Sequence, residues 1–227
     1  MMWVAYFFLC RPGEYCATVD DGNKFFRLCD VGLRNGAAAL DLATAPAEDL
    51  RRATFALLEF TEQKNGEKGE KVGQYDSGHP AASATKAIAE QVLHLREHGA
   101  PSDAPLCSYW HHGRWYLVTP PAITMLLRDA ASNVGHKYGI KPEDISARSL
   151  RASGAMALLC ADVDPVKIRI LGRWKSDTML RYLHIQAPTL VRGLASGMLA
   201  AGDFSFLPET RQYRLVADEQ PDGLYQD

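Results

Sequence analysis

Two blocks near the C-terminal end of the sequence constrain the fold more than any other feature. The first block reads S-L-R-A-S-G-A over residues 149–155, and the second reads L-G-R-W-K-S-D-T-M-L-R-Y over residues 171–182. Small residues follow Arg151 in the first block, and a glycine inside a helical pattern usually has a packing reason. In the second block Gly172 separates two short helical patterns. The blocks therefore predict closely packed helices that hold Arg151, Arg173 and Tyr182 at fixed separations.

Apolar spacing and turn residues predict an α+β fold that is mainly α. Helices are expected over residues 2–10, 83–97, 120–133, 149–160, 165–171, 177–184 and 188–201. Strands are expected over residues 25–31, 54–61 and 71–75, which would form a small antiparallel sheet, and a second hairpin is expected over residues 109–117. We expect one domain over residues 1–202 and a poorly ordered, acidic tail over residues 203–227.

The charge of the chain is unevenly distributed. The 227 residues are 47% hydrophobic and 23% charged, which is typical of a globular protein, and carry a net charge of −2. Residues 137–181 hold nine Lys and Arg against five Asp and Glu, whereas residues 203–227 hold six acids against two arginines. The basic segment coincides with the two blocks and indicates a polyanionic partner.

The sequence offers little support for a membrane segment or a metal site. Residues 1–10 are apolar but too short for a membrane span or a signal peptide. Five cysteines lack paired C-x-x-C spacing, which favours a reduced, intracellular protein without a cysteine-based zinc site. The neighbouring His111 and His112 are expected to point to opposite faces of a strand, and no third ligand has supporting spacing. We therefore predict no metal.

Four motifs, two of which belong to these blocks, together resemble the tyrosine recombinase (phage integrase) family over about residues 3–201. They are F-F-L-C-R-P-G-E-Y around Arg11, Q-K-N-G at Lys64, R-S-L-R at Arg148 and Arg151, and the nine-residue spacing from Arg173 to Tyr182. The family uses an arginine followed three residues later by a glutamate, a hairpin lysine, a His-x-x-Arg box, a His or Trp, and a nucleophilic tyrosine. The run G-R-W-K-S-D looks more like recombinases of eukaryotic mobile elements and algal genomes than bacterial ones.

The resemblance implies the DNA breaking-rejoining catalytic fold, with a small antiparallel sheet packed on a helical core. It implies that Tyr182 attacks a DNA phosphate held by Arg11 and Arg151, while Arg148 and Arg173 supply further donors. Lys64, with Lys68 and Lys71 as rivals, would protonate the leaving oxygen, and Glu14 would orient Arg11. Flanking DNA contacts are expected from Lys137, Lys141, Lys175 and Arg181. The implied partner is double-stranded DNA, without a cofactor, inside the cell: in the nucleus of a eukaryote or the cytoplasm of a prokaryote.

The chain departs from the family pattern in two ways. Arg148 and Arg173 stand where the family has histidine or tryptophan, and arginine cannot accept a proton at neutral pH. Trp174 could fill the His/Trp position, and His184 or His136 could act as the base. The separate core-binding domain is expected to be missing, because the first motif lies close to Met1. A catalytically impaired DNA-binding remnant therefore stays open as the alternative.

The last expected helix, residues 188–201, has an apolar face formed by Leu190, Leu194 and Met198. Helices with such a face commonly pack against a partner. The resemblance implies that this helix supports self-association on DNA, because enzymes of the family often pass a C-terminal helix to a neighbouring protomer.

Overall fold

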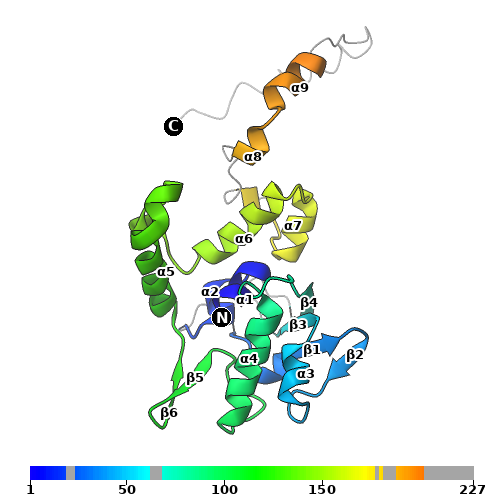
Figure 1. Cartoon of the computed structure of the whole chain (residues 1–227), viewed down its shortest axis with the longest axis vertical. Coiled ribbons are helices and arrows are strands. Elements are labelled where there is room, and N and C mark those ends of the chain that lie inside the picture. The colour runs from blue at the N-terminus through cyan, green and yellow to red at the C-terminus, as the bar shows by residue number, and fades with distance from the viewer. Residues whose placement is uncertain (19–23, 62–67, 177–178, 181–187, 202–227) are drawn as a thin grey trace, which may run out of the picture. The chain divides into compact units, whose positions relative to one another are not determined.

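The computed structural model describes residues 1–18, 24–61, 68–176, 179–180 and 188–201. The chain divides into two units, Met1–His184 and Ile185–Asp227, each defined by contacts among its own residues. The domain boundary expected after residue 202 stays a prediction. The first unit has helices together with a small antiparallel sheet, so the α+β class is confirmed (Figure 1).

Helices account for most of the regular structure of the described residues. In the first unit the α-helices are α1 (Met2–Phe7), α2 (Pro12–Tyr15), α3 (Ala47–Arg51), α4 (Ala84–Glu97), α5 (Pro120–Val134), α6 (Ser149–Cys160) and α7 (Pro165–Leu171). Three 3-10 helices are η1 (Leu28–Asp30), η2 (Gly135–Tyr138) and η3 (Pro142–Asp144). The second unit contains α8 (Pro188–Val191) and α9 (Leu194–Ala201). The expected starts of α4 and α5 are confirmed, and the Ser83 hydroxyl accepts a hydrogen bond from the Lys86 amide at 3.0 Å.

The strands form two separate antiparallel sheets. The larger sheet has the order β2-β1-β3-β4, with β1 (Val31–Asn35), β2 (Ala38–Leu40), β3 (Phe55–Phe60) and β4 (Glu70–Tyr75). Burial alternates along β3, because successive side chains point to opposite faces of the sheet. The smaller sheet pairs β5 (Ser108–His111) with β6 (Arg114–Leu117), which confirms the second expected hairpin.

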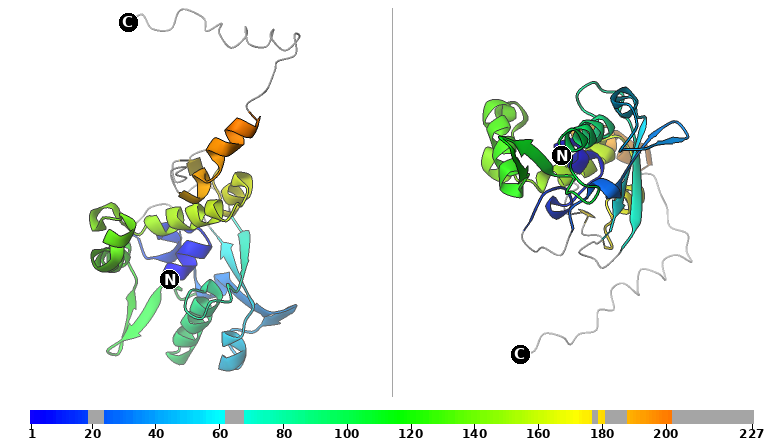
Figure 2. Two further views of the ribbon diagram at one scale, coloured as in Figure 1. Left: turned by 45° about the horizontal axis from the view of Figure 1, so that its top comes forward. Right: turned by 90° about the horizontal axis from the view of Figure 1, so that it is seen from below.

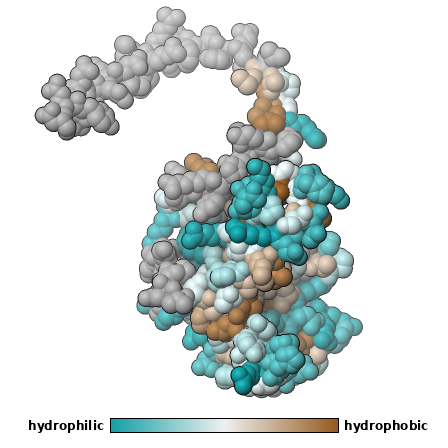
Figure 3. Space-filling view, turned by 90° about the vertical axis from the view of Figure 1, so that its left-hand side faces the viewer, coloured by the Kyte–Doolittle hydropathy of each residue, from teal (hydrophilic) through white to brown (hydrophobic). Residues whose placement is uncertain are grey.

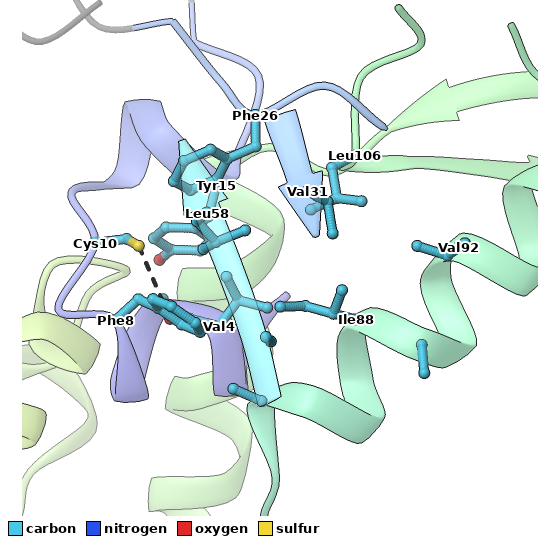
Figure 4. Packing of buried hydrophobic residues seen from close by; sticks show 14 of the residues in the cluster. Val4, Phe8, Cys10, Tyr15, Phe26, Val31, Leu58, Ile88, Val92 and Leu106 are labelled. Carbon is cyan, nitrogen blue, oxygen red and sulfur yellow. Dashed lines mark hydrogen bonds between the residues drawn. The ribbon is translucent and has the colours of Figure 1, made fainter. Parts of the chain in front are cut away.

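The core lies where α1 and α4 cover one face of the larger sheet. Figure 4 shows Leu58 of β3 in one cluster with Val4 of α1, with Phe8 just after α1 and with Ile88 of α4, and all four side chains are buried. Tyr15 of α2 is fully buried in the same cluster, and its hydroxyl donates to the carbonyl of Ala147 at 2.9 Å. This bond ties α2 to the residues that precede α6.

Helix α6 packs directly on α1 because a glycine faces it, and Figure 2 shows the two helices side by side. A Cβ atom at Gly154 would lie 2.2 Å from the Tyr6 carbonyl oxygen and 2.6 Å from Leu9 Cδ2. Such distances are far inside van der Waals contact. The small residues after Arg151 therefore serve the close packing that the sequence predicted.

The strand expected over residues 25–31 is wrong. Only Arg27 makes a bridge there, with Pro105, and the chain then forms η1 before β1 begins at Val31. The Asp30 carboxylate accepts from the Arg27 amide at 2.8 Å and pairs with its guanidinium at 3.0 Å. Local side-chain bonds of this kind compete with a strand ladder.

The single helix expected over residues 188–201 is also wrong. The structure has two helices, α8 and α9, that are separated at Arg192 and Gly193. Gly193 has φ 81°, a left-handed conformation that ends a helix. Most of the helix expected over residues 177–184, and the tail over residues 203–227, lie outside the described residues.

We predict that Gly154→Ala destabilises the protein by about 1–3 kcal/mol, because overpacking forces α1 and α6 apart. The measurement is urea denaturation followed by circular dichroism. Gly197→Ala is the matched control, since that glycine lies in α9 and a Cβ there would meet nothing within 4 Å. Equal stabilities for the two variants would contradict the proposed close contact.

Candidate functional site

The site begins at the turn between α1 and α2. Leu9 has φ 50°, and this left-handed residue turns the chain so that Arg11 caps the start of α2. The Glu14 carboxylate accepts from the Arg11 amide at 2.6 Å and from Arg11 Nη1 at 3.0 Å. Glu14 is 1% exposed, whereas the Arg11 side chain is 23% exposed. Glu14 therefore holds the Arg11 side chain in place at the start of α2.

Arg173 reaches the same carboxylate from the turn after α7. Its φ is 58°, and its wholly buried side chain donates from Nη2 to Glu14 Oε2 at 3.1 Å. The guanidinium also donates to the carbonyls of Phe8 and Leu9 at 3.2 Å, and it lies 3.7 Å from the centroid of the Phe60 ring. Its buried Nε has no hydrogen-bond partner among the residues that the structure describes.

Arg151 of α6 completes the convergence of arginines. Its Nη1 donates to the Leu9 carbonyl at 2.9 Å, and its Nη2 donates to the Gly172 carbonyl. The guanidinium lies 4.1 Å from the centroid of the Trp174 ring. Burial, followed by the charge of Arg11, lowers the pKa of Arg151 to about 10, so the side chain stays cationic at neutral pH.

Within the described part of the chain, three arginines thus surround the single carboxylate of Glu14 and the carbonyl of Leu9. This arrangement holds more positive than negative charge in a mostly buried environment. Burying cations is costly unless an anion is near. The cluster, which we call the Glu14 cluster (Arg11, Glu14, Arg151, Arg173), is therefore suited to attract an anion at Arg11, whose side chain is only partly buried.

Cys10 lies beside the Glu14 cluster but is chemically quiet. Burial, and next the charge of Glu14, raises the pKa of the Cys10 thiol to about 12, although Arg173 and Arg151 act in the opposite direction. The thiol is therefore protonated at neutral pH. Since the thiolate is the nucleophilic form, Cys10 is a packing residue.

Arg148 lies at the start of α6, on the surface. It lines a hollow of about 440 Å³ together with Pro12, Thr18, Pro120, Thr124, Ser146 and Ala147. The Ala147 amide donates to the Thr124 hydroxyl at 3.0 Å, and its carbonyl accepts from Tyr15. These bonds fix Arg148 next to the start of α2, where Pro12 follows Arg11. An exposed arginine at a concave surface can contact a phosphate directly.

The remaining site residues of the sequence analysis fall into two groups. Lys137, Lys141 and Lys175 are exposed, and the first two lie in η2 and just before η3. Lys64, Arg181 and Tyr182 lie outside the described residues, as does His184. Of the other residues considered as substitutes, His136 is exposed in η2, whereas the Trp174 ring packs against Arg151.

One expected role differs from the structure. The sequence placed Arg173 among the donors to a phosphate, but its side chain is 0% exposed and bonded to Glu14 and main-chain carbonyls. Arg173 therefore positions the loop that carries Arg11. Sequence reasoning missed this because the partners lie 159 residues apart along the chain. The only available signal was the presence of an arginine at a position where the family has histidine.

The two neighbouring histidines of the β5–β6 hairpin lie close together. His112 has φ 46° and lies in the hairpin turn, so its ring is 3.9 Å from that of His111, and the expectation that they point to opposite faces is wrong. The described residues contain no group of three or more His, Cys, Asp and Glu placed to hold a metal ion. No helix among them is long and apolar enough to cross a membrane.

Comparison with protein-family models, with curated proteins and with solved structures found no match to this chain.

We predict that Glu14→Gln lowers the free energy of unfolding by about 3–5 kcal/mol, because it leaves buried arginines without their anion. The matched control is Glu90→Gln, which removes an exposed partner of Arg51 and should cost at most about 1 kcal/mol. Urea denaturation of both variants at pH 7 is the measurement. If Glu14→Gln were as stable as the control, the carboxylate would not hold the cluster together.

Proposed function

We propose that this chain cleaves and rejoins DNA strands in the manner of a tyrosine recombinase, on the catalytic fold of that family. One observation carries the proposal. Arg11, Arg151 and Arg173 come from three distant segments that the motifs single out, and they meet at Glu14 and the Leu9 carbonyl. Guanidinium groups match phosphate oxygens and stay charged at physiological pH.

The proposed reaction is a phosphoryl transfer to a tyrosine oxygen. The Tyr182 oxygen attacks the phosphorus of a DNA phosphodiester, the bond to the 5′ oxygen breaks, and a 3′-phosphotyrosyl bond forms. Lys64 gives a proton to the leaving 5′ oxygen, which becomes a hydroxyl. Rejoining reverses these steps with the 5′ hydroxyl of the same or another strand. The covalent bond conserves the energy of the phosphodiester, so no nucleotide is consumed.

The roles that we propose for the described arginines differ with the exposure of their side chains. Arg11 and Arg148 are accessible and would contact the phosphate oxygens, where fixed donors stabilise the charge of the transition state. Arg151 would contribute its charge from beneath, with its main-chain bonds fixing its position. Arg173 would act on the reaction only through Glu14 and the turn after α1. Lys137, Lys141, Lys175 and Arg181 would bind flanking phosphates of the duplex.

The proton of Tyr182 has no acceptor among the matched residues. Arginine at position 148 can stabilise a phenolate by its charge but cannot take the proton. This favours slow cleavage. It also supports a second candidate function, DNA binding without cleavage, because both positions that the family gives to histidine hold arginine and Arg173 is wholly buried.

A suicide duplex, nicked so that the cleaved end diffuses away, tests the first candidate. We expect wild-type protein to form a covalent adduct that gel electrophoresis detects and that Tyr182→Phe abolishes while duplex binding persists. Tyr138→Phe is the matched control, because Tyr138 is an exposed tyrosine of η2 outside the motifs, and it should retain the adduct. Binding without any adduct would select the second candidate, and absence of duplex binding would refute both.

We further predict that Arg148→His speeds adduct formation by about tenfold or more, because histidine supplies the missing proton acceptor at the start of α6. The measurement is the rate of adduct formation between pH 6 and 8 on the same duplex, where the gain should grow as the histidine loses its proton. Arg148→Gln, which removes the charge without adding a base, is the control. Equal rates for the two variants would show that no base is needed at this position.

A further inference from the structure

The hairpin β5–β6 has one face that no other described element covers. The strands pair only with each other, and the register places Tyr109 opposite Tyr116, Trp110 opposite Trp115, and His111 opposite Arg114. Because side chains alternate along a strand, the tryptophans lie on one face and the other two pairs lie on the opposite face. An isolated two-stranded hairpin is only marginally stable in water, so one face must be supported.

The face that carries Trp110 and Trp115 packs against His94 of α4 and against His98, which follows α4. The Trp110 ring lies 5.6 Å from the His98 ring, and the Trp115 ring lies 6.2 Å from the His94 ring. The Trp110 amide donates to His94 Nε2 at 2.8 Å. Helix α4 thereby fixes the direction in which the hairpin projects, as Figure 1 shows.

The opposite face, which we call the tyrosine face (Tyr109, His111, Arg114, Tyr116), combines aromatic rings with cations. The rings of Tyr109 and Tyr116 are stacked, with centroids 5.6 Å apart and 23° between their planes, yet each residue is 41% exposed. His111 and Arg114 lie beside them and are exposed. In Figure 3, teal, white and brown residues all occur in the lower half of the side of the molecule that faces the viewer.

The segment that carries the tyrosine face contains a cationic residue but no acidic one. The sequence contains no acidic residue from position 104 to position 118, although the whole chain carries a net charge of −2. Within that stretch Arg114 carries a positive charge. The charge of the tyrosine face therefore suits a polyanion, and its aromatic rings suit a ligand that contains flat rings.

We propose that the tyrosine face binds unpaired bases of single-stranded DNA. Exposed aromatic side chains with adjacent cations are the usual means of holding a single strand, because every unpaired base offers a π surface while the cations meet the phosphates. A duplex hides its base faces and would contact only Arg114 and the histidines. The choice of DNA rests on the proposed function, since strand exchange exposes unpaired bases, whereas the stacking argument rests on the hairpin alone.

The site would act separately from the Glu14 cluster. Its residues belong to β5 and β6, and none of them contacts Arg11, Arg148, Arg151 or Arg173 through a described hydrogen bond or ring contact. Binding of a single strand here therefore requires neither the nucleophile nor the phosphate-binding arginines. This separation allows an experiment that is independent of cleavage.

The test uses the full chain and a fluorescently labelled oligothymidylate of about 12 nucleotides, a length within the range of single-strand sites. Fluorescence anisotropy gives the affinity, and an abasic oligomer of equal length serves as competitor. The double variant Tyr109→Thr with Tyr116→Thr removes both rings but keeps residues that favour strands. The double variant to Phe keeps both rings. Tyr75→Thr, which changes a 78% exposed tyrosine of β4, is the matched control.

We expect the Thr double variant to bind the oligothymidylate about tenfold to a hundredfold more weakly, since stacking on aromatic rings supplies that much affinity. The Phe double variant and Tyr75→Thr should bind as wild type does, and the abasic oligomer should compete poorly. Near-ultraviolet circular dichroism of the tryptophans reports whether the hairpin is intact. If the Thr variant loses that signal, the abasic competition with wild-type protein and the Phe variant decide the question.

Three outcomes would overturn the proposal. Equal competition by the abasic oligomer would mean that only charge is recognised. Unchanged binding of the oligothymidylate by a folded Thr double variant would show that the bases bind outside the tyrosine face. A change of oligomeric state in the Thr variant without DNA, measured by light scattering, together with unchanged binding would assign the face to protein contacts. Loss of the covalent adduct on the nicked duplex, by contrast, would leave this proposal standing, because the oligothymidylate assay needs no cleavage.

Discussion

The site depends on the hydrogen bonds that the buried carboxylate of Glu14 accepts from two arginines. These arginines are Arg11 in the turn before α2 and Arg173 in the turn after α7. Arg151 joins the same two turns through the carbonyls of Leu9 and Gly172. Two segments far apart in the sequence are thus joined by charge-assisted bonds, which are stronger than neutral ones and favour one geometry. The cluster would lose its only described anion without Glu14.

The scaffold around this cluster explains why the arginines can be buried. Because Gly154 has no side chain, α6 can approach α1 closely. This close packing places the Arg151 guanidinium within hydrogen-bond distance of the Leu9 carbonyl. Trp174 then covers Arg151, and Phe60 of β3 lies under Arg173. Aromatic rings offset part of the cost of removing a cation from water. The hairpin β5–β6 uses aromatic residues differently, since one of its faces packs on α4 and the other remains open.

Much of the fold could be predicted where local patterns decide it. The helix that begins after Ser83, the helix that begins with Pro120, and the hairpin around His112 and Gly113 all follow from caps, proline and turn chemistry. The two incorrect predictions, at residues 25–31 and 188–201, each have a local cause that apolar spacing does not show. At Asp30 a side chain competed with the strand ladder, and at Gly193 a left-handed residue ended a helix that apolar spacing alone would continue.

The sequence by itself singled out Arg11, Arg148 and Arg151 by their motifs, and it placed aromatic and cationic residues together in the hairpin over residues 109–117. Only the tertiary structure decided that Arg173 is wholly buried and bonded to Glu14, while Arg11 and Arg148 remain accessible. The physical reason is that motif spacing fixes positions along the chain, whereas desolvation depends on which distant segments pack together. Burial of an arginine depends on its neighbours, and the partners of Arg173 at Phe8 and Glu14 lie 165 and 159 residues away along the chain.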